Sequence, residues 1–382
     1  MNVLFITRGW PTPSDPMSGN YEAVQAKALV RKGVNVTVFN FKWKSLLHVF
    51  DRKKFNNFEE DGVKVFQAEM VIPVIPHVLD SFELQRKGKR KALLKFYKKY
   101  LQKNPTVDIV HAHSAFEAYI ASVLKEKYHM PFVITEHWSK MNSDFIGEEE
   151  KRMGEGYVDA DQVISVSDQL ASSLKSKFGI DCIVIHNMVS DHFFDGELHQ
   201  RISDQISFVS VGALNKGKGY DILIKAFADV DNDTNITLRI IGSGPEESKL
   251  RQLIEENQLH NRVYLLGRKK PDEVSSIIAD SDCFILTSRG ETFGIVYIEA
   301  MAKGKPVIAT KCGGPEGFVN DSNGLLIPKE DIPAATKAIE YMVEHVKEYD
   351  AKKIRQDCYE NFSENVIANR IIGVYNQVLQ KS

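Results

Sequence analysis

The distribution of apolar residues restricts this chain to one class of fold. Short runs rich in β-branched residues alternate with longer amphipathic stretches from one end of the sequence to the other. This alternation predicts repeated strand and helix units, whose parallel strands are buried on both faces. The runs are NVLFIT, VNVTVF, DIVHAH, PFVITEH, QVISVS and CIVIH in the first half, and ISFVSVG, TLRIIG, RVYLLG, CFILTS, PVIAT and GLLIP in the second. We therefore expect an α/β protein with two doubly wound parallel sheets in series.

The length of the chain agrees with two domains. Its 382 residues exceed the size of an ordinary single core. The polar stretch 187–205, which Gly196 interrupts, is the expected hinge. We therefore divide the chain into a first domain of residues 1–190 and a second domain of residues 191–362.

The charge of the chain gives no reason to expect a nucleic-acid partner. The formal net charge is −2, whereas nucleic-acid binding depends on basic surfaces. Residues 1–190 hold 26 Lys and Arg against 22 Asp and Glu, and the remainder holds 23 against 29. The two halves are therefore expected to face different partners.

The cysteines and the amino-terminal residues indicate a cytoplasmic protein. The four cysteines are Cys182, Cys283, Cys312 and Cys358, and they lie too far apart to predict a disulfide framework or a thiolate zinc site. The first apolar run extends only from Val3 to Ile6, and no apolar segment of 18 residues follows. We expect neither a signal peptide nor a membrane span.

The segment 285–317, ILTSRGETFGIVYIEAMAKGKPVIATKCGGPEG, carries the strongest chemical motif. A strand ending near Ser288 is followed by a loop and by a helix that begins at about Ile295 and ends before Gly304. The free amides of Ile295 and Val296 are expected to form an anion cradle. Seven residues separate Glu291 from Glu299, which places one carboxylate in the loop and one in the helix.

This segment resembles the donor-site motif of the retaining glycosyltransferases of family four, which have the GT-B fold. Further segments match in order and spacing, namely VGALNKGKGYDILIKAF, IIGSGPEESKL, VYLLGRKKPDEV and NGLLIPKED in the second half, and PMSGNYEAVQAKALVRKGVNVTVF, DIVHAH, TEH and VIHNMVSDHFF in the first. The resemblance implies two Rossmann-like domains that face a central cleft. It also implies that residues 363–382 form a helix returning to the first domain.

The resemblance implies a retaining transfer of a glycosyl group from a nucleoside diphosphate-sugar to a hydroxyl, without a metal or another cofactor. The acceptor is expected to be a glycan or a lipid-linked saccharide of a bacterial surface-polysaccharide pathway. The first domain would bind this acceptor and the second domain would bind the donor.

The resemblance also implies a set of site residues. Lys218 would bind the diphosphate, Glu291 the sugar hydroxyls and Glu299 the ribose hydroxyls, while His137 would contact the sugar at the reacting centre. Of these, His137, Lys218 and Glu291 are the candidate catalytic residues. The full set of candidate donor-binding residues is Gly19, Gly212, Lys218, Gly244, Arg268, Glu291, Phe293, Gly294, Ile295, Val296 and Glu299.

Two positions depart from the pattern of the family. Ala213 stands where relatives usually have Arg, and Asn20 stands where they often have a second glycine. Lys216 is a candidate replacement for the missing cation, but it is equally consistent with a solvated surface lysine. Glycine is also absent from position 247, where a dinucleotide-binding motif beginning at Gly242 would need it, which argues against a nicotinamide cofactor.

Residues 84–103 form a basic segment with nine Lys and Arg and no acid. A basic amphipathic helix can lie on an anionic membrane, but a helix that packs on a sheet also leaves its lysines in water. We expect the cluster from Arg86 to Lys91, together with Trp43, Leu46, Leu47 and Phe50, to dock a membrane-bound acceptor.

Two other functions fit the same fold. A nucleotide-sugar epimerase would consume the donor without an acceptor, and the spacing of Glu291 and Glu299 argues against it. A non-catalytic protein that binds nucleotides or carbohydrates is the second alternative. The presence of Lys218, Glu291 and Glu299 argues against it, and Ala213 keeps it open.

Overall fold

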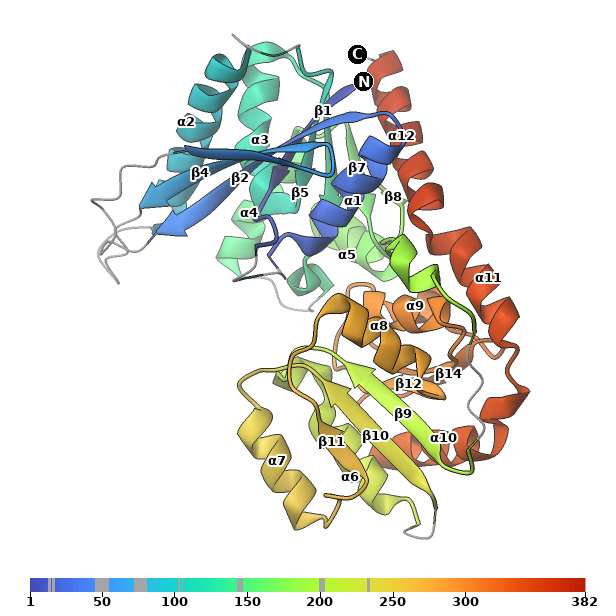
Figure 1. Ribbon diagram of the computed structural model, residues 1–382. Coiled ribbons are helices and arrows are strands. Elements are labelled where there is room, and N and C mark those ends of the chain that lie inside the picture. Colours follow the sequence, from blue (N-terminus) through green and yellow to red (C-terminus); the bar gives the residue numbers. More distant parts are fainter. Residues whose placement is uncertain are drawn as a thin grey trace. The chain divides into compact units, whose positions relative to one another are not determined.

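The computed structural model describes the whole chain except residues 13–14, 16–17, 45–54, 72–80, 102–103, 105, 143–146, 199–202, 232–233 and 382. The chain folds into two compact units. The first comprises Met1–His186 and Glu364–Ser382, and the second comprises Asn187–Ser363. Each unit has its own sheet covered by its own helices (Figure 1).

An eight-stranded sheet forms the centre of the first unit, in the order β3-β4-β2-β1-β5-β6-β7-β8. The strands are β1 (Asn2–Thr7), β2 (Asn35–Lys44), β3 (Phe55–Glu60), β4 (Val63–Val71), β5 (Ile109–His113), β6 (Phe132–Glu136), β7 (Gln162–Ser165) and β8 (Cys182–Val184). Each neighbouring pair is parallel except β3 and β4. Strand β1 lies inside the sheet, which explains why its residues from Val3 to Ile6 are buried and apolar.

The hairpin of β3 and β4 adds an antiparallel edge to the expected parallel sheet. Its turn consists of Asp61 and Gly62, whose φ values are 50° and 77°. Two consecutive positive φ values define a type I′ turn, for which Asp-Gly is a preferred sequence. The hairpin joins the sheet because β4 pairs in parallel with β2. The Asp-Gly pair therefore indicates a hairpin at this position of the sequence.

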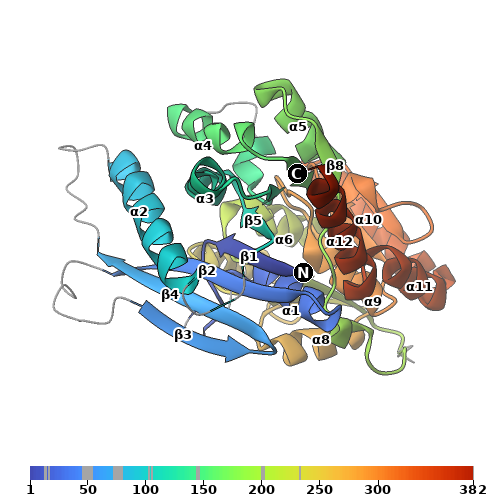
Figure 2. The same cartoon turned by 90° about the horizontal axis from the view of Figure 1, so that it is seen from above.

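Two groups of helices cover this sheet on opposite sides (Figure 2). The helices are α1 (Asn20–Arg31), α2 (Ser81–Leu101), α3 (Ala115–Tyr128), α4 (Glu148–Val158), α5 (Asp168–Phe178) and α12 (Glu364–Lys381). On one side Phe39 of β2 stacks on Phe96 of α2 at 4.2 Å between ring centroids. On the other side His111 of β5 hydrogen-bonds through Nδ1 to the Tyr375 hydroxyl of α12 at 2.6 Å. The last helix of the chain is thus part of the first unit, where it also packs against α1.

The second unit contains a six-stranded parallel sheet in the order β11-β10-β9-β12-β13-β14. The strands are β9 (Ile206–Val211), β10 (Ile236–Ile241), β11 (Val263–Leu265), β12 (Cys283–Leu286), β13 (Val307–Thr310) and β14 (Gly324–Ile327). The chain winds outwards from the pair β9 and β12 in both directions. This order brings the loops after β9 and β12 next to each other, where an open α/β sheet binds its ligand.

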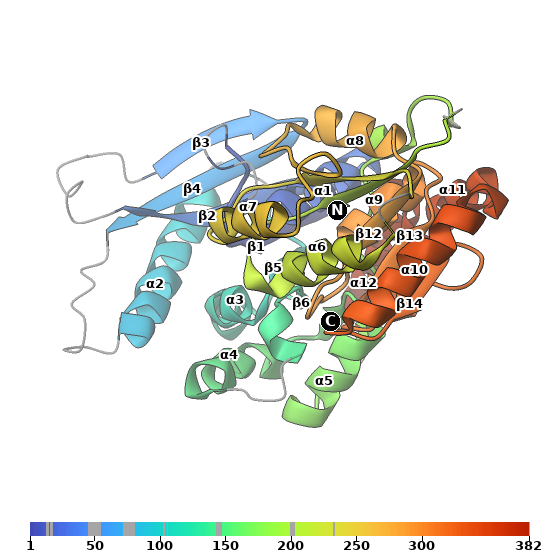
Figure 3. The ribbon, with the colours of Figure 1, turned by 90° about the horizontal axis from the view of Figure 1, so that it is seen from below.

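The helices of the second unit also form two groups (Figures 1 and 3). The first group is α6 (Tyr220–Asp229), α7 (Glu247–Glu256) and α10 (Ile332–His345), and the second is α8 (Pro271–Ala279), α9 (Ile295–Ala302) and α11 (Ala351–Phe362). Helix α9 has the predicted bounds, since it begins after Gly294 and is followed by Gly304 with a φ of 70°. None of the helices in the described parts of the chain combines the length and the hydropathy that a membrane span requires.

Candidate active site

The candidate donor site lies at the carboxyl edge of the second sheet, where the loops after its strands contact one another. The loop 212–214 after β9 lies against residues 242–244 after β10, since Leu214 N donates to the Ser243 carbonyl at 3.0 Å. On the other side the loop after β12 is joined to the loop after β13, because Glu291 N donates to the Cys312 carbonyl at 3.2 Å. One continuous edge therefore holds most of the predicted donor-binding residues.

The predicted Gly244, and Gly242 beside it, are needed for this close packing of loops. A Cβ added to Gly244 would lie 2.4 Å from the Leu214 carbonyl oxygen. Gly212 approaches Gly242 in the same way, because a Cβ on Gly242 would lie 1.9 Å from the Gly212 oxygen. A side chain at position 242 or 244 would therefore separate the two loops.

Lys218 and Glu291 form the central pair of this edge. The Lys218 ammonium lies 2.6 Å from Glu291 Oε1, and the Ser288 hydroxyl donates to the same oxygen at 2.6 Å. The Lys218 side chain is 24% exposed and that of Glu291 is 10% exposed. A cation and an acceptor that are both held in place, yet partly open to solvent, form a suitable site for a polar anion. Ser288 was not predicted as a site residue, although it stands three positions before Glu291.

The amino terminus of α9 supplies the predicted anion cradle. Gly294 precedes the helix with a φ of 95°, in the left-handed region that glycine tolerates. Within the described residues, the amides of Ile295 and Val296 have no hydrogen-bond partner. These amides and the helix dipole favour an anion. Phe293 contributes differently, since its ring is buried against Phe318 at 5.0 Å and only its backbone can reach a ligand.

Glu299 stands one turn into α9 and is half-buried. Its carboxylate makes no hydrogen bond or ion pair to any residue that the structure describes. Burial raises the pKa of Glu299 to about 7. An acceptor that lacks partners and resists ionisation is suited to hydroxyl donors from a ligand.

The candidate cations of the donor site differ in their surroundings. Arg268 follows β11 and is exposed, and the neighbouring Gly267 carbonyl accepts a hydrogen bond from Gly242 N at 3.0 Å. Ala213 is exposed and supplies no charge, whereas Lys216 is exposed and has no ion pair in the described part of the chain. Of Arg268, Lys216 and Lys218, Lys218 is thus the cation that an ion pair holds at this edge.

His137 lies in the first unit, directly after β6. Its Nε2 is 3.2 Å from Nδ1 of His113, and the two rings stack at 5.5 Å. Burial keeps the pKa of His113 well below its usual range, so this ring is neutral. Among the described residues, no group of His, Cys, Asp and Glu is arranged to hold a metal ion.

Glu136 fixes the backbone around His137, which sequence reasoning missed. The Glu136 carboxylate is fully buried and accepts hydrogen bonds from the amides of Ala115, His137 and Trp138 at 2.8 to 2.9 Å. The Tyr157 hydroxyl donates to it as well, at 2.6 Å. Burial raises the pKa of Glu136, and these four donors oppose that shift. The acid in TEH thus orients the loop that carries the histidine.

Gly19 is required by the local backbone of the first unit. It precedes α1 with a φ of 68°, and an added Cβ would lie 2.3 Å from the Gly9 carbonyl oxygen. This contact accounts for the glycine without a ligand. Asn20 is the first residue of α1.

The basic segment divides into buried and exposed cations. Arg86 is 1% exposed and pairs with Glu155 at 2.6 Å, and its guanidinium lies 3.4 Å from the centre of the Tyr119 ring. Lys89 is buried near Glu117, and Arg90 binds the Tyr119 carbonyl at 2.9 Å. The cluster from Arg86 to Lys91 is therefore not one free surface. Leu46, Leu47, Phe50 and the side chain of Trp43 lie outside the described residues.

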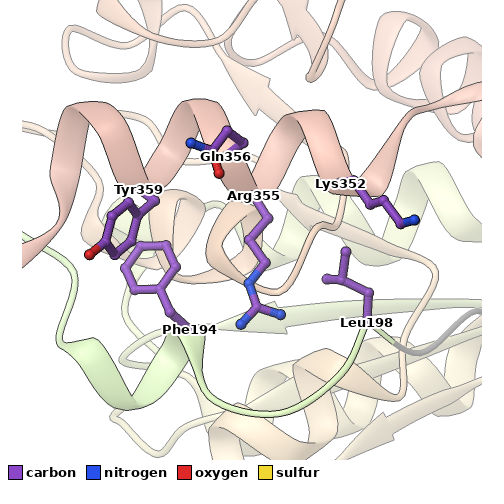
Figure 4. Close-up of a pocket in the computed structure, with 6 residues that line it drawn as sticks. All are labelled: Phe194, Leu198, Lys352, Arg355, Gln356 and Tyr359. Carbon is purple, nitrogen blue, oxygen red and sulfur yellow. The ribbon is translucent and has the colours of Figure 1, made fainter.

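A separate cavity of about 390 Å³ lies between α11 and the segment before β9 (Figure 4). It is lined by Phe194, Leu198, Lys352, Arg355, Gln356 and Tyr359. The Arg355 guanidinium donates to the Gly196 carbonyl at 2.9 Å, and Phe194 packs edge-on against Tyr359. Since none of the predicted donor-binding residues lines it, this cavity is not the candidate donor site.

Comparison with known proteins identifies the family. "Glycosyltransferase Family 4" matches residues 20–193, and "Glycosyl transferases group 1" matches residues 197–362. An uncharacterised glycosyltransferase of Methanocaldococcus jannaschii is 31% identical over 286 residues, which cover 72% of this chain and 75% of that protein. The chain therefore belongs to the group 1, family 4 glycosyltransferases, and the family expected from the motifs is confirmed.

Two further relatives extend the comparison to nearly the whole chain. The putative teichuronic acid biosynthesis glycosyltransferase TuaC of Bacillus subtilis is 27% identical over 359 residues, covering 89% of this chain and 88% of its own. The solved structure of Anabaena HepE with UDP-glucose has a TM-score of 0.72 at 18% identity, covering 99% of this chain and 100% of that one. The GT-B fold class is thereby confirmed, with the hairpin β3 and β4 as an addition to the parallel strands.

Proposed function

We propose that this glycosyltransferase moves a hexosyl group from a nucleoside diphosphate-sugar to a hydroxyl of a glycan or lipid-linked saccharide, with retention at the anomeric carbon. The observation that carries the proposal is the pairing of Lys218 with Glu291 on the edge that also holds the free amides of Ile295 and Val296. That edge combines donors for a diphosphate with acceptors for hydroxyls. UDP-glucose bound to HepE supports this class of donor.

The proposed chemistry needs stabilisation of a leaving diphosphate. The bond from the anomeric carbon to the phosphate oxygen breaks, and its electron pair passes to the diphosphate. Lys218 and the α9 amides are placed to offset this charge without a metal ion. The acceptor oxygen then bonds to the same face of the sugar, and its proton passes to the departing phosphate oxygen. Glu291 and Glu299 orient the hydroxyls of the sugar and the ribose.

We assign separate roles to two domains, residues 1–190 and residues 191–362, and we assign residues 363–382 to the side of the first domain. The first part binds the acceptor and presents His137 and Gly19 to the reacting centre. The second part binds the donor. Helix α12 packs against α1 within the first unit. This contact supports the assignment of residues 363–382 to the acceptor side.

We place the enzyme in the cytoplasm, in peripheral contact with the membrane that carries the acceptor. Residues 84–103 hold a row of exposed lysines at helical spacing, which supports this contact: Lys87, Lys91, Lys95, Lys98 and Lys99. Teichuronic acid synthesis, named for TuaC, supports a bacterial surface polysaccharide as the product. A lipid-linked intermediate of such a polymer would lie at an anionic surface.

A donor panel tests the proposal. Purified protein is incubated with UDP-, GDP- and ADP-sugars, with and without lipid-linked saccharides, and released nucleoside diphosphate is measured. We expect release that requires an acceptor and survives a metal chelator. Donor consumption without an acceptor would indicate the epimerase alternative, and binding without turnover would indicate the non-catalytic alternative, which Ala213 keeps open.

A further inference from the structure

We propose that Arg289 is a positioning residue, which fixes the loop that carries Lys218 so that its ammonium meets the donor diphosphate. This inference rests on the proposed function of Lys218. Arg289 stands in the loop between β12 and α9, two residues before Glu291. Neither the motif nor the resemblance assigned it a role.

Arg289 binds the loop on the amino-terminal side of Lys218 through two backbone contacts. Its own amide donates to the Gly217 carbonyl at 2.8 Å, and its guanidinium Nη1 donates to the Lys216 carbonyl. These contacts join the loop after β12 to the two residues that precede Lys218. The short helical turn Lys216–Lys218 is thereby attached at its start.

Arg289 also binds the carboxyl-terminal side of the same loop. Its Nη1 and Nη2 donate to the two oxygens of Asp221 at 2.9 and 2.8 Å, in the bidentate geometry that arginine and carboxylate favour. Thr287, two residues before Arg289, donates through its hydroxyl to the Gly219 carbonyl at 2.7 Å. The residues before and after Lys218 are therefore held by one neighbouring loop.

The same contacts fix Lys218 relative to Glu291. Both the anchoring arginine and the carboxylate partner belong to the loop after β12, so the ammonium and its partner are positioned by one segment. A Cβ on Gly219 would lie 2.0 Å from the Thr287 carbonyl oxygen, which shows how closely the two loops approach. The position of the Lys218 ammonium is thus set before a donor arrives, as preorganised electrostatic stabilisation requires.

Arg289 is not itself a second cation for the diphosphate. Besides Asp221 it binds Glu330, through Nε and through Nη2 at 3.3 Å, so two carboxylates offset its single charge. These hydrogen bonds raise the pKa of Arg289 above its ordinary value. Glu330 adopts a φ of 62°, a left-handed conformation that glutamate rarely takes, and its carboxylate binds the arginine in this conformation. Because Ala213 supplies no charge, binding of the diphosphate depends more strongly on the placement of Lys218.

The test compares nucleoside diphosphate binding in a double-mutant cycle. The variants are Arg289→Gln, Lys218→Met and the double variant, and the probes are UDP, GDP and ADP, measured by calorimetry. We expect Arg289→Gln to weaken the best-bound probe about tenfold and to lower kcat, with the acceptor KM unchanged. If Arg289 acts through Lys218, the double variant should bind the probe no more than about threefold more weakly than Lys218→Met alone.

Conservative and control variants separate positioning from stability. Arg289→Lys retains the charge but not the bidentate pair, so we expect it to recover only part of the affinity. Arg251→Gln, which removes an exposed pair with Glu247 on α7, should leave binding unchanged. If Arg289→Gln does not fold, Asp221→Asn carries the same cycle, because the Asp221 side chain is 45% exposed.

Each outcome decides one of the two assignments. Fully additive losses in the cycle, or unchanged binding in Arg289→Gln and Asp221→Asn while Lys218→Met is impaired, would overturn the positioning role alone. Unchanged binding in Lys218→Met would instead overturn the proposed donor site, and the positioning role with it. A deficit in the double variant equal to that of Lys218→Met supports both.

Discussion

Single residues of the candidate donor edge carry polar groups whose arrangement suits ligand binding more than it stabilises the free protein. Glu299 shows this most clearly, because it is half-buried, its pKa is raised to about 7, and none of the described residues bonds to its carboxylate. Lys218 and Glu291 show the other case, since each satisfies the other at 2.6 Å until a ligand arrives. Both arrangements lead to measurable consequences.

Replacing Glu299 by Gln should stabilise the free protein in a pH-dependent way. The folded pKa of Glu299 is raised to about 7 from 4.5, so its contribution to stability is complete below pH 4.5 and is lost as the pH rises through 7. The variant should therefore match wild type at pH 4.5 and exceed it above pH 7 by at most about 3 kcal/mol. Urea denaturation at both pH values measures this difference.

The same variant should bind nucleoside diphosphate more weakly, by about tenfold, because a neutral amide is a poorer acceptor for ribose hydroxyls. Glu340→Gln, an exposed change on α10 of the same unit, is the control. Equal donor binding in Glu299→Gln and wild type would contradict the assignment of Glu299 to the ribose.

Replacing Glu291 by Gln should separate binding from turnover. In the free protein the Glu291 carboxylate is paired with the Lys218 ammonium. A diphosphate that binds to Lys218 must therefore compete with this carboxylate. Removal of the carboxylate should strengthen the binding of UDP, which lacks the glycosyl group to be transferred, by a few-fold, while kcat with the sugar nucleotide falls by about a hundredfold. Calorimetry and initial rates measure the two effects, and a parallel loss of UDP binding would oppose this account.

At the scale of elements, two segments of the first unit differ from the sequence expectation for identifiable reasons. The strands β3 and β4 were missed because one edge of the sheet is antiparallel, and their signal was a turn rather than an apolar run. Helix α2 was predicted as amphipathic, but spacing alone did not show that Arg86 and Lys89 pair with acids of distant elements. By contrast, α9 followed directly from Gly294, the apolar run and Gly304, which are local signals.

The turn of the hairpin can be tested with two glycine substitutions. Gly62→Ala places a side chain at a φ of 77° and 2.9 Å from Val30 Cγ1, whereas Gly33→Ala has a φ of 80° and nothing within 4 Å. We expect Gly33→Ala to lower the free energy of unfolding by about 1 kcal/mol and Gly62→Ala to lower it more. If chemical denaturation gave the same loss of unfolding free energy for both variants, the contact between position 62 and Val30 of α1 would be unimportant.

The two faces of α2 should respond differently to mutation. Arg86→Ala breaks a buried pair and should lower the free energy of unfolding by about 1–3 kcal/mol. Changing Lys87, Lys91 and Lys95 to Glu should leave stability nearly unchanged and weaken co-sedimentation with anionic vesicles. Thermal denaturation measures the stability of both variants, and co-sedimentation measures their binding to vesicles. Vesicle binding that is unaffected by the charge reversal would argue against a membrane role for this face.

At the scale of the whole molecule, the near-neutral charge combines a basic first part and an acidic second part. The acidic part holds the candidate donor edge, so we expect an anionic donor to be bound there by local groups, namely the α9 amides and Lys218. Sequence motifs predicted these groups because the loops that carry them directly follow strands of the sheet. They did not indicate Arg289 or Glu136, which hydrogen-bond to segments far away in the sequence. They did not indicate Ser288 either, although its hydroxyl bonds to Glu291 only three residues away.

The most direct test of the central claim is acceptor-dependent release of nucleoside diphosphate from a panel of nucleotide-sugars, comparing wild type with Lys218→Met. We predict release by wild type with at least one donor, only when a saccharide acceptor is present, and at least a hundredfold less release by Lys218→Met. Equal release by the two proteins, or release that does not depend on an acceptor, would contradict the account.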